Sequence, residues 1–231
     1  MPASFVGHPI AYEYDIKVNK NLEKKSLGLE KSSDRANKSI FIALLPGSRV
    51  SEVARMLSIF LAVADKLYKK NENLKFLIPR AHKNLKNLLD NNLSKYPDLP
   101  VKVFEGEAQA VLKSSQIALI TSGTATLEAL MAKTLMVVAY VAPSISYLVY
   151  KHLVKTPYIG LPNILAGKMI VPEFIQKQAT VDNLVVSAQE QIDILYSKEG
   201  SNLLAEFAKT HQSLRVRSDV LLDVIARVCK D

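Results

Sequence analysis

Short apolar runs alternate with longer amphipathic segments through the middle of the chain. An apolar run of this length is typical of a strand buried on both faces, as in a parallel sheet. The runs predict strands at 39–45, 74–78, 101–104, 116–120 and 135–140. The periodicity between them predicts helices at 49–70, 82–93 and 108–113, and one that opens at 121–124 and runs through Ala132. Strands and helices that alternate with such short connections predict an α/β fold built on a doubly wound parallel sheet.

The pattern is different at both ends of the chain. Near the N-terminus we expect a strand and turn at 5–10, a weak helix at 11–25 and a polar linker at 30–38. After Pro143 we expect a helix at 144–154, a proline-punctuated loop at 157–163, and helices at 182–196 and 203–228. The predicted organisation is a terminal segment (1–38), a Rossmann-like domain (39–180) and extra C-terminal helices (181–231).

The composition is that of an ordinary globular protein, with 231 residues, 48% hydrophobic, 23% charged and a formal net charge of +8. This charge fits either a solvated basic surface or an attraction to anionic partners. Nucleic acid is not expected, because aromatic and basic residues do not interleave and no known nucleic-acid-binding signature is present. No apolar run approaches the ~20 residues of a membrane-spanning helix. Cys229 is the single cysteine, so we expect no disulfide and a reducing cytoplasm.

Two predicted strands end in small polar residues that lead directly into a helix. They are Pro46-Gly47-Ser48-Arg49 and Thr121-Ser122-Gly123-Thr124. Glycine allows the backbone to approach an anion closely, and the free N–H groups at a helix N-terminus point at it. Neither segment matches a Walker loop or the Rossmann glycine pattern, and each alone fits a simple turn with a helix cap. Their occurrence together on one rim of the sheet favours a site for phosphate.

Two charged residues extend this prediction. Arg49 falls in the first turn of the predicted helix, where a cation opposes the helix dipole unless an anion is bound. Its alternative is a partner in a surface ion pair. Glu128 lies one turn into the helix that follows Ser122-Gly123. An acid there either stabilises the helix dipole or accepts two hydroxyls of a ribose or sugar.

A second polar group, Asn163, Glu173 and Gln176, lies in or beside the proline-punctuated segment. Rigid polar loops often hold specificity residues, but the residues alone favour a turn-forming asparagine and a solvated glutamate and glutamine. The histidines at 82, 152 and 211 lie on helical patterns without acidic or cysteine partners at metal spacing. We therefore predict no metal and no cofactor.

Five segments together resemble the lipid-A-disaccharide synthase family. They are FVGHP at 5–9, LPGSRVSE at 45–52, TSGTATLE at 121–128, PYIGLPNILAG at 157–167 and VPEFIQ at 171–176. The last two, at this spacing, are specific to the family, and the resemblance covers residues 5–225.

The resemblance implies a GT-B glycosyltransferase of lipid A synthesis in Gram-negative bacteria, with two Rossmann-like halves that face a cleft. Such enzymes transfer 2,3-diacylglucosamine from its UDP donor to 2,3-diacylglucosamine 1-phosphate and release UDP with inversion. By analogy, Gly47, Ser48 and Arg49 would contact the UDP diphosphate, with Ser122, Gly123 and Thr124 assisting, and Arg49 would stabilise the leaving group. Glu128 would bind the ribose hydroxyls. The donor pocket would also be lined by Asn163, Glu173 and Gln176.

The family's N-terminal half, with its acceptor loop and candidate catalytic carboxylate, is expected to be absent from this chain. We therefore expect a donor-binding half that has no general base and is inactive alone. The alternatives are another UDP-sugar enzyme, such as the peptidoglycan N-acetylglucosaminyltransferase or a UDP-sugar epimerase, and a non-catalytic remnant that binds nucleotide. We expect a cytoplasmic location with peripheral contact to the inner face of the inner membrane, where residues 144–154 either face the lipid or pack against the sheet.

Overall fold

The computed structural model of the chain describes residues 7–29, 39–141 and 157–215, and it is built around a six-stranded sheet. The order of the strands in the sheet is β3-β2-β1-β4-β5-β6, and every neighbouring pair is parallel. The doubly wound parallel sheet predicted from the sequence is therefore confirmed. The strands are β1 (Ile40–Leu45), β2 (Leu74–Arg80), β3 (Val101–Glu105), β4 (Ile117–Ile120), β5 (Leu135–Tyr140) and β6 (Glu173–Ile175).

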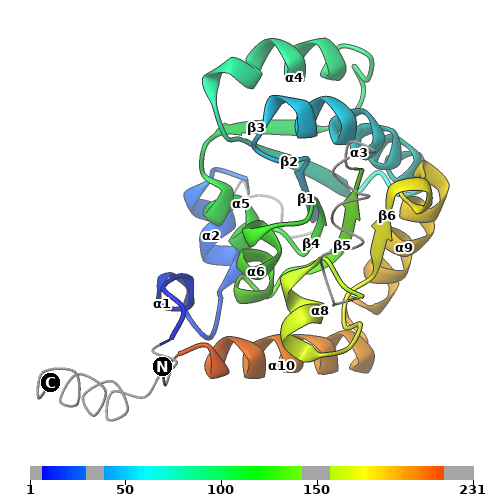
Figure 1. The fold of residues 1–231 in the computed structure, drawn as a ribbon. Helices are drawn as coiled ribbons and strands as arrows, with labels where there is room; N and C mark the ends of the chain where they lie inside the picture. The colour runs from blue at the N-terminus through cyan, green and yellow to red at the C-terminus, as the bar shows by residue number, and fades with distance from the viewer. Residues whose placement is uncertain (1–6, 30–38, 142–156, 216–231) are drawn as a thin grey trace, which may run out of the picture.

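Helices cover both faces of this sheet (Figure 1). On one face, α3 (Val50–Lys70) packs against α4 (Lys86–Leu93) and α9 (Val181–Ile194). On the other face, α5 (Ala108–Ser114) packs against α6 (Thr124–Met131) and α2 (Lys20–Ser26). Parallel strands favour right-handed connections, so a chain that reverses its direction along the sheet between β3 and β4 places helices on both faces. The remaining helices are α1 (Ile10–Glu13), α8 (Leu161–Ala166) and α10 (Lys198–Ser213), with short 3₁₀ turns at Lys83–Leu85 and Gln176–Gln178.

The centre of the sheet and α3 form most of the core. All four residues of β4 are buried, as are five of the six residues in both β1 and β5. α3 presents a stripe of apolar side chains to the sheet at helical spacing: Val53, Met56, Leu57, Phe60, Leu61, Val63, Ala64 and Leu67. Leu45 pairs with Ile120, so the carboxyl ends of β1 and β4 lie side by side at one rim.

The sequence predicts that β2 ends before Pro79, but the strand continues through Arg80. The N–H of Phe76 donates to the carbonyl of Pro100 at the start of β3. Successive backbone N–H groups of a strand point to opposite sides, so the nitrogen of residue 79 faces β1. The pairing of β2 with β1 stops at Leu77. A proline at position 79 thus removes no ladder hydrogen bond.

Residues 157–176 are more regular than predicted. The expected loop gives way to α8 at Leu161, and Pro162 falls in the first turn of the helix, where its missing N–H is tolerated. Residues 173–175 form β6, which pairs with the end of β5. The sequence does not predict this strand, because three half-buried residues are too few to show a strand pattern.

The two ends of the chain also differ from the prediction. Ile10 begins α1 instead of ending a strand, and the weak helix expected at 11–25 is two short helices, α1 and α2. α10 starts earlier than expected, at Lys198, because Ser197 caps it by accepting a hydrogen bond from the Gly200 N–H (3.2 Å). The helix expected at 144–154 lies outside the described residues, as do residues 1–6, 30–38 and 216–231 of the other predicted segments.

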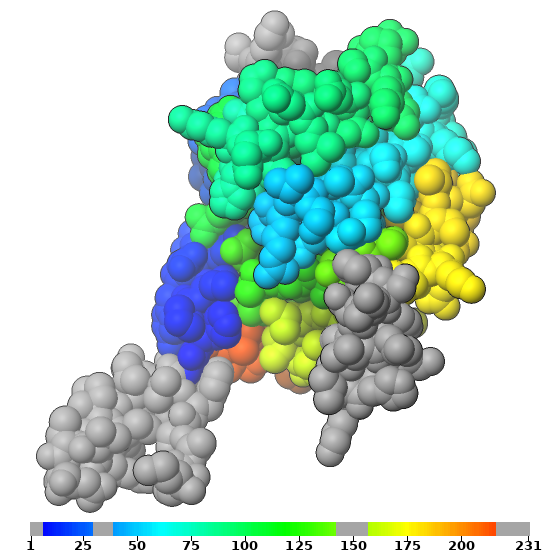
Figure 2. Space-filling view, turned by 45° about the horizontal axis from the view of Figure 1, so that its top comes forward, coloured from blue at the N-terminus to red at the C-terminus, as the bar shows by residue number. Residues whose placement is uncertain are grey.

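The N-terminal segment packs against the rest of the fold, beside α10 (Figure 2). The His8 N–H donates to the Leu214 carbonyl at the end of α10 (2.9 Å). The ammonium of Lys20 donates to the Ser115 carbonyl (2.5 Å), the Ala132 carbonyl (3.2 Å) and the Thr134 hydroxyl (3.0 Å). Ser115 and Ala132 cap the C-termini of α5 and α6, whose dipoles favour a cation, whereas burial opposes the charge and lowers the pKa of Lys20 to about 7.

His211 provides a second anchor and is fully buried. Its Nε2 atom lies 2.8 Å from the Ala11 carbonyl, which can only accept, so Nε2 carries the ring proton. Its Nδ1 atom then accepts from the ammonium of Lys133 (3.0 Å). Burial lowers the pKa of His211, against the opposing effect of the Ala11 carbonyl, and the charges of Lys133 and Arg215 add to the decrease.

We expect the free energy of unfolding to fall as the pH drops below about 6.5. The unfolded chain binds a proton on His211 near its ordinary pKa, whereas the folded chain resists protonation until a lower pH, so acid favours unfolding. Urea unfolding at pH ~7.5 and ~5 measures the effect. A His211→Gln variant keeps one donor but does not titrate, and its stability should depend less on pH. An equal dependence in both proteins would contradict the prediction.

Candidate functional site

A cleft of about 510 Å³ opens at the rim where the carboxyl ends of β1 to β4 meet. β1 and β4 lie side by side in the sheet, and the chain leaves them in opposite directions. This arrangement is the switch point at which doubly wound sheets bind ligands. Residues 47–49 and 122–124 all line the cleft. The structure thus brings the two predicted turns together in one cavity.

The turn after β1 depends on Gly47, whose φ of +115° is unfavourable for any residue with a Cβ. A Cβ at this position would also lie 2.8 Å from Oε2 and 2.9 Å from Cβ of Glu52. Glu52 itself lines the cleft. It is absent from the residues predicted for the site, although it lies in the family-like segment at 45–52.

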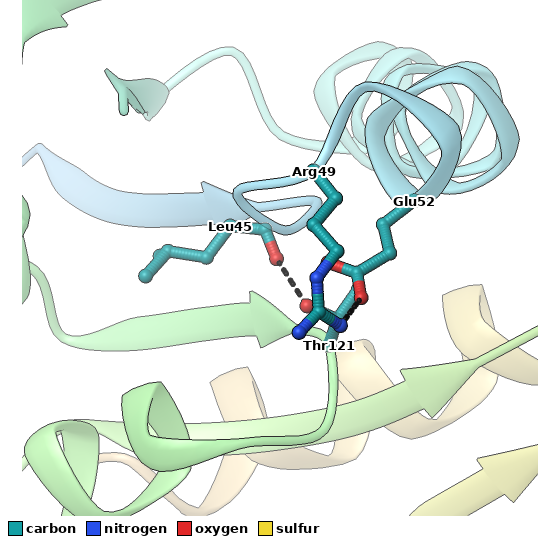
Figure 3. A network of polar contacts seen from close by, with 4 residues as sticks. All are labelled: Leu45, Arg49, Glu52 and Thr121. Atoms are coloured by element: carbon teal, nitrogen blue, oxygen red, sulfur yellow. Dashed lines mark hydrogen bonds and ion pairs between the residues drawn. The ribbon is translucent and has the colours of Figure 1, made fainter. Parts of the chain in front are cut away.

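Arg49 is positioned differently from the prediction. It is the N-cap of α3 with extended backbone (φ −86°, ψ 140°) and does not lie inside the first turn. Its guanidinium donates to Glu52 Oε1 (3.0 Å), near the point where the Thr121 hydroxyl donates to the Leu45 carbonyl (Figure 3). The Arg49 side chain is 81% exposed, so this ion pair contributes little to stability. A bound anion can therefore compete for the guanidinium at low cost.

The turn after β4 is held from both sides. Gly123 has a φ of +132° and is the N-cap of α6, whose first N–H groups have no partner within the helix. The Ser122 hydroxyl donates to the Ile159 carbonyl (2.9 Å). The Thr126 hydroxyl donates to the Gly123 carbonyl (2.7 Å) and accepts from the Leu161 N–H (3.1 Å). The turn is thereby fastened to the backbone that leads into α8, and sequence reasoning overlooks this role of Thr126.

One side of the cleft, at the carboxyl ends of β2 and β3, is not part of the site predicted from the sequence. Pro79 and Ala81 line it from the end of β2, and Gly106, Glu107 and Ala108 line it from the turn after β3. Glu107 has a left-handed backbone (φ +46°), which is uncommon for a residue other than glycine. A Gly-containing turn between a predicted strand and a predicted helix is the signal that could have indicated this third turn.

Asn163 is completely buried, and all hydrogen-bonding positions of its side chain are occupied. Its Nδ2 donates to the Val171 carbonyl (2.8 Å) and to Glu173 Oε1 (2.7 Å). Its Oδ1 accepts from the N–H groups of Ile170 (2.7 Å) and Val171 (2.9 Å). This side chain has no capacity left for a ligand, so the geometry supports a positioning role in place of direct contact.

Glu173 is not the solvated residue that its sequence context favours. Its carboxylate accepts from the N–H groups of Ile159 (2.8 Å) and Gly160 (2.9 Å) as well as from Asn163. A Cβ at position 160 would lie 2.8 Å from Glu173 Oε1, so Gly160 is what allows this approach. Asn163 and Glu173 together hold residues 159–161 against the turn after β4.

Gln176 and Glu128, like Asn163 and Glu173, are not among the residues that line this cleft. Gln176 follows β6 with a left-handed backbone (φ +54°), a strained conformation that often occurs at functional sites. Glu128 is half-buried on α6, and burial, together with the nearby charge of Glu13, raises the pKa of its carboxyl.

We expect the substitution Gly47→Ala to destabilise the protein by about 1–3 kcal/mol and to weaken anion binding, because the new Cβ displaces Glu52 and with it Arg49. Thermal unfolding and UDP titration measure the two effects. Gly28→Ala is the matched control, since Gly28 also has a positive φ (+60°) but no atom within 4 Å of the added Cβ. Equal effects of the two substitutions would contradict the predicted clash.

The part of the chain that the structure describes contains no group of three or more histidine, cysteine or acidic side chains that could hold a metal ion. Over the same residues, no helix is long and apolar enough to span a bilayer. The cleft offers backbone N–H groups, small hydroxyls, the Arg49 guanidinium and the carboxylates of Glu52 and Glu107.

A family model described as lipid-A-disaccharide synthetase matches residues 1–223, which is nearly the whole chain. The chain belongs to this family. The resemblance seen in its motifs is confirmed, and with it membership of a glycosyltransferase family of lipid A synthesis. The matched region includes all of the cleft residues.

Relatives in the lipid-A-disaccharide synthase family match the chain over most of its length. The synthase of Psychromonas ingrahamii is 36% identical over 220 residues, which are 95% of this chain and 55% of that protein. The synthase of Cellvibrio japonicus is 35% identical over an alignment of 232 positions that covers 100% of this chain and 58% of that protein. The chain spans about half the length of the curated relatives it matches.

Solved structures share the fold of this family member at low sequence identity. The C-terminal CMP-Kdo binding domain of WaaA from Acinetobacter baumannii aligns with a TM-score of 0.54 and 13% identity, and 84% of this chain covers 100% of that chain. Anabaena HepE in complex with UDP and glucose aligns with a TM-score of 0.52 and 12% identity over 91% of this chain and 51% of that one. At such identities the likeness shows the Rossmann-like fold alone.

Proposed function

We propose that this chain provides the UDP-sugar-binding part of a lipid-A-disaccharide synthase. The whole reaction would transfer 2,3-diacylglucosamine from its UDP donor to 2,3-diacylglucosamine 1-phosphate. The proposal also includes a cytoplasmic location with peripheral contact to the inner membrane, since both substrates carry acyl chains. The observation that supports it best is the convergence of residues 47–49 and 122–124 in one cleft at the switch point of the sheet.

The two turns offer the groups that a diphosphate requires. Gly47 and Gly123, both at positive φ, allow the backbone to approach the anion without a Cβ between them. The N-termini of α3 and α6 supply N–H groups and a positive dipole end. Arg49 supplies a planar, exposed guanidinium at the same rim. HepE was solved with UDP and glucose, which makes UDP the natural first ligand to test here.

In the proposed reaction the 6-hydroxyl oxygen of the acceptor bonds to the anomeric carbon of the donor sugar. The bond from that carbon to the β-phosphate oxygen breaks, and its electron pair leaves with UDP. The hydroxyl proton passes to a base on the opposite face of the sugar, a role to which none of the residues above is assigned. The turns and Arg49 stabilise the charge that develops on the diphosphate, an effect of several kcal/mol where water is excluded.

Calorimetric titration of the protein with UDP and UMP tests the proposal. We expect UDP to bind about 10-fold or more tightly than UMP, because the second phosphate gains charge-assisted hydrogen bonds from the turns. Absence of measurable UDP binding would contradict the proposal. Equal affinity for UDP and UMP would also contradict it, since the turns would then not hold the diphosphate.

A further inference from the structure

The cleft carries more negative than positive charge, although the chain as a whole is basic. Among the described residues that line it, the charged ones are Arg49, Glu52 and Glu107. One guanidinium and two carboxylates sum to a formal charge of −1, whereas the whole chain carries +8. A site that only had to attract a diphosphate would carry an excess of positive charge. The two carboxylates therefore need a separate explanation.

Glu52 places its carboxylate where a phosphate would be expected. It lies in the first turn of α3, near the positive end of the helix dipole. Its Oε1 atom accepts from the Arg49 guanidinium (3.0 Å), as Figure 3 shows. Its Oε2 atom lies over the turn after β1, because a Cβ on Gly47 would come within 2.8 Å of it. The Glu52 side chain is only 15% exposed, so it is held beside the groups that are proposed to bind the diphosphate.

The Arg49–Glu52 pair changes how the cleft responds to the charge of a ligand. Alone, the Arg49 guanidinium would bind a more negative phosphate more tightly. The Glu52 carboxylate lies at hydrogen-bond distance from it, so the two opposite charges largely cancel for any further charge nearby. The guanidinium still offers directional N–H donors to a phosphate. The pair can thus recognise the geometry of a phosphate while gaining little from additional negative charge.

The substrate and the product of the proposed reaction differ by one charge at this place. In a sugar nucleotide the β-phosphate is esterified, and the diphosphate carries about two negative charges. In free UDP the same phosphate is terminal and ionises once more with a pKa of about 6, so the diphosphate carries about three. The two phosphates share a bridging oxygen. The extra charge therefore falls near Glu52 whichever phosphate Arg49 holds.

We propose that Glu52 is a specificity-determining residue, which lowers the affinity for the free nucleoside diphosphate relative to that for its ester, such as a sugar nucleotide. This inference rests on the proposed function and extends it to the release of the product. The carboxylate repels the additional charge of UDP, so UDP leaves more readily once the sugar has been transferred. The same repulsion opposes the charge that develops as the bond to the sugar breaks, so some stabilisation of the leaving group is lost.

The test compares UDP with its β-methyl ester, which keeps the diphosphate but lacks one charge and carries no sugar. Calorimetric titration at pH ~8 gives the ratio of the two affinities in the native protein and in Glu52→Gln. We expect the substitution to raise the affinity for UDP by about 10-fold more than the affinity for the ester, the effect of one unit charge at short range in a partly screened site. Glu52→Ala also removes the charge and replaces Glu52→Gln if that variant does not fold.

Two controls make the same change of charge elsewhere. Asp182→Asn removes an acid from the first turn of α9, where Asp182 pairs with Lys66 (2.7 Å) and does not line the cleft. It should leave the ratio of affinities unchanged. Glu107→Gln removes the other carboxylate of the cleft, on the turn after β3. It should change the ratio less than Glu52→Gln does, because no hydrogen bond to Arg49 is lost.

Each other outcome overturns the inference. An unchanged ratio in Glu52→Gln would show that the carboxylate does not sense the charge of the ligand. Equal losses of affinity for both ligands would show that Glu52 only supports the turn at Gly47. A shift of the same size in Glu107→Gln would assign the discrimination to the net charge of the cleft. Failure of the native protein to bind either ligand is distinguishable from these results, because it overturns the proposed function itself and this inference with it.

Discussion

Asn163→Ala is expected to destabilise the protein by at least about 3 kcal/mol, the largest effect on stability that we predict for a single polar residue. The substitution leaves the Val171 carbonyl and the N–H groups of Ile170 and Val171 without their side-chain partner. It also removes one of the two hydrogen bonds that Glu173 Oε1 accepts, the other coming from the Gly160 N–H. Residues 159–161 would lose their support, and with them the turn after β4. We therefore also expect UDP affinity to fall, by about 10-fold. Urea unfolding and UDP titration measure the two effects.

The matched control for this variant is Asn183→Ala. Asn183 also donates from Nδ2 to a carbonyl, that of Gln178 (2.9 Å), but it is exposed on α9 and away from the cleft. Its substitution should change the free energy of unfolding by about 0.5 kcal/mol or less. If Asn163→Ala proves as mild as this control, the buried network does not support the site and the positioning role is wrong. A stable Asn163→Ala protein that loses UDP binding would instead point to direct contact with the ligand.

Arg49→Ala is expected to weaken UDP binding by about 10- to 100-fold, the largest effect on affinity. The guanidinium is exposed and paired only at the surface, so its removal should leave the unfolding temperature within about 2 °C of the native value. Arg49→Lys should recover part of the affinity, because it keeps the charge but not the bidentate geometry. Raising the salt concentration should narrow the difference between native and Arg49→Ala proteins.

Lys66→Ala is a suitable control for the charge change. Lys66 also forms an exposed ion pair, with Asp182 (2.7 Å), but it lies on α3 and does not line the cleft. The Lys66→Ala substitution should leave the affinity for UDP unchanged. Similar losses from Arg49→Ala and Lys66→Ala would show that UDP responds to net charge alone, and not to a guanidinium placed between the two turns.

The two turns of the site and the strands before them could be predicted from the sequence, because they depend on the residue pattern of short segments. Buried apolar runs identify β1 and β4, and glycine with small polar residues identifies the turns after them. Parallel strands then bring these turns to one rim, where residues 47–49 and 122–124 line one cleft. The error at Arg49 is a shift of one position, from the first turn of α3 to its N-cap, and helix ends are the least certain part of any such prediction.

The rest of the site depends on contacts between distant segments, which no local pattern reveals. The roles of Asn163 and Glu173 arise because the chain doubles back between α8 and β6, so that each side chain meets backbone many residues away. Glu128 is half-buried near Glu13. Glu13 belongs to the N-terminal segment, which the sequence predicts to lie outside the Rossmann-like domain. The side of the cleft at the ends of β2 and β3 is formed by residues such as Pro79 and Ala81, whose residue types do not indicate a binding site.

A crystal structure of the protein with UDP tests the central claim most directly. The account predicts that the diphosphate lies between the turns after β1 and β4, within hydrogen-bond distance of backbone N–H groups from both. It also predicts that the Arg49 guanidinium leaves Glu52 and turns to a phosphate oxygen. UDP bound elsewhere on the protein, or bound in the cleft with its phosphates directed away from both turns, would contradict the account.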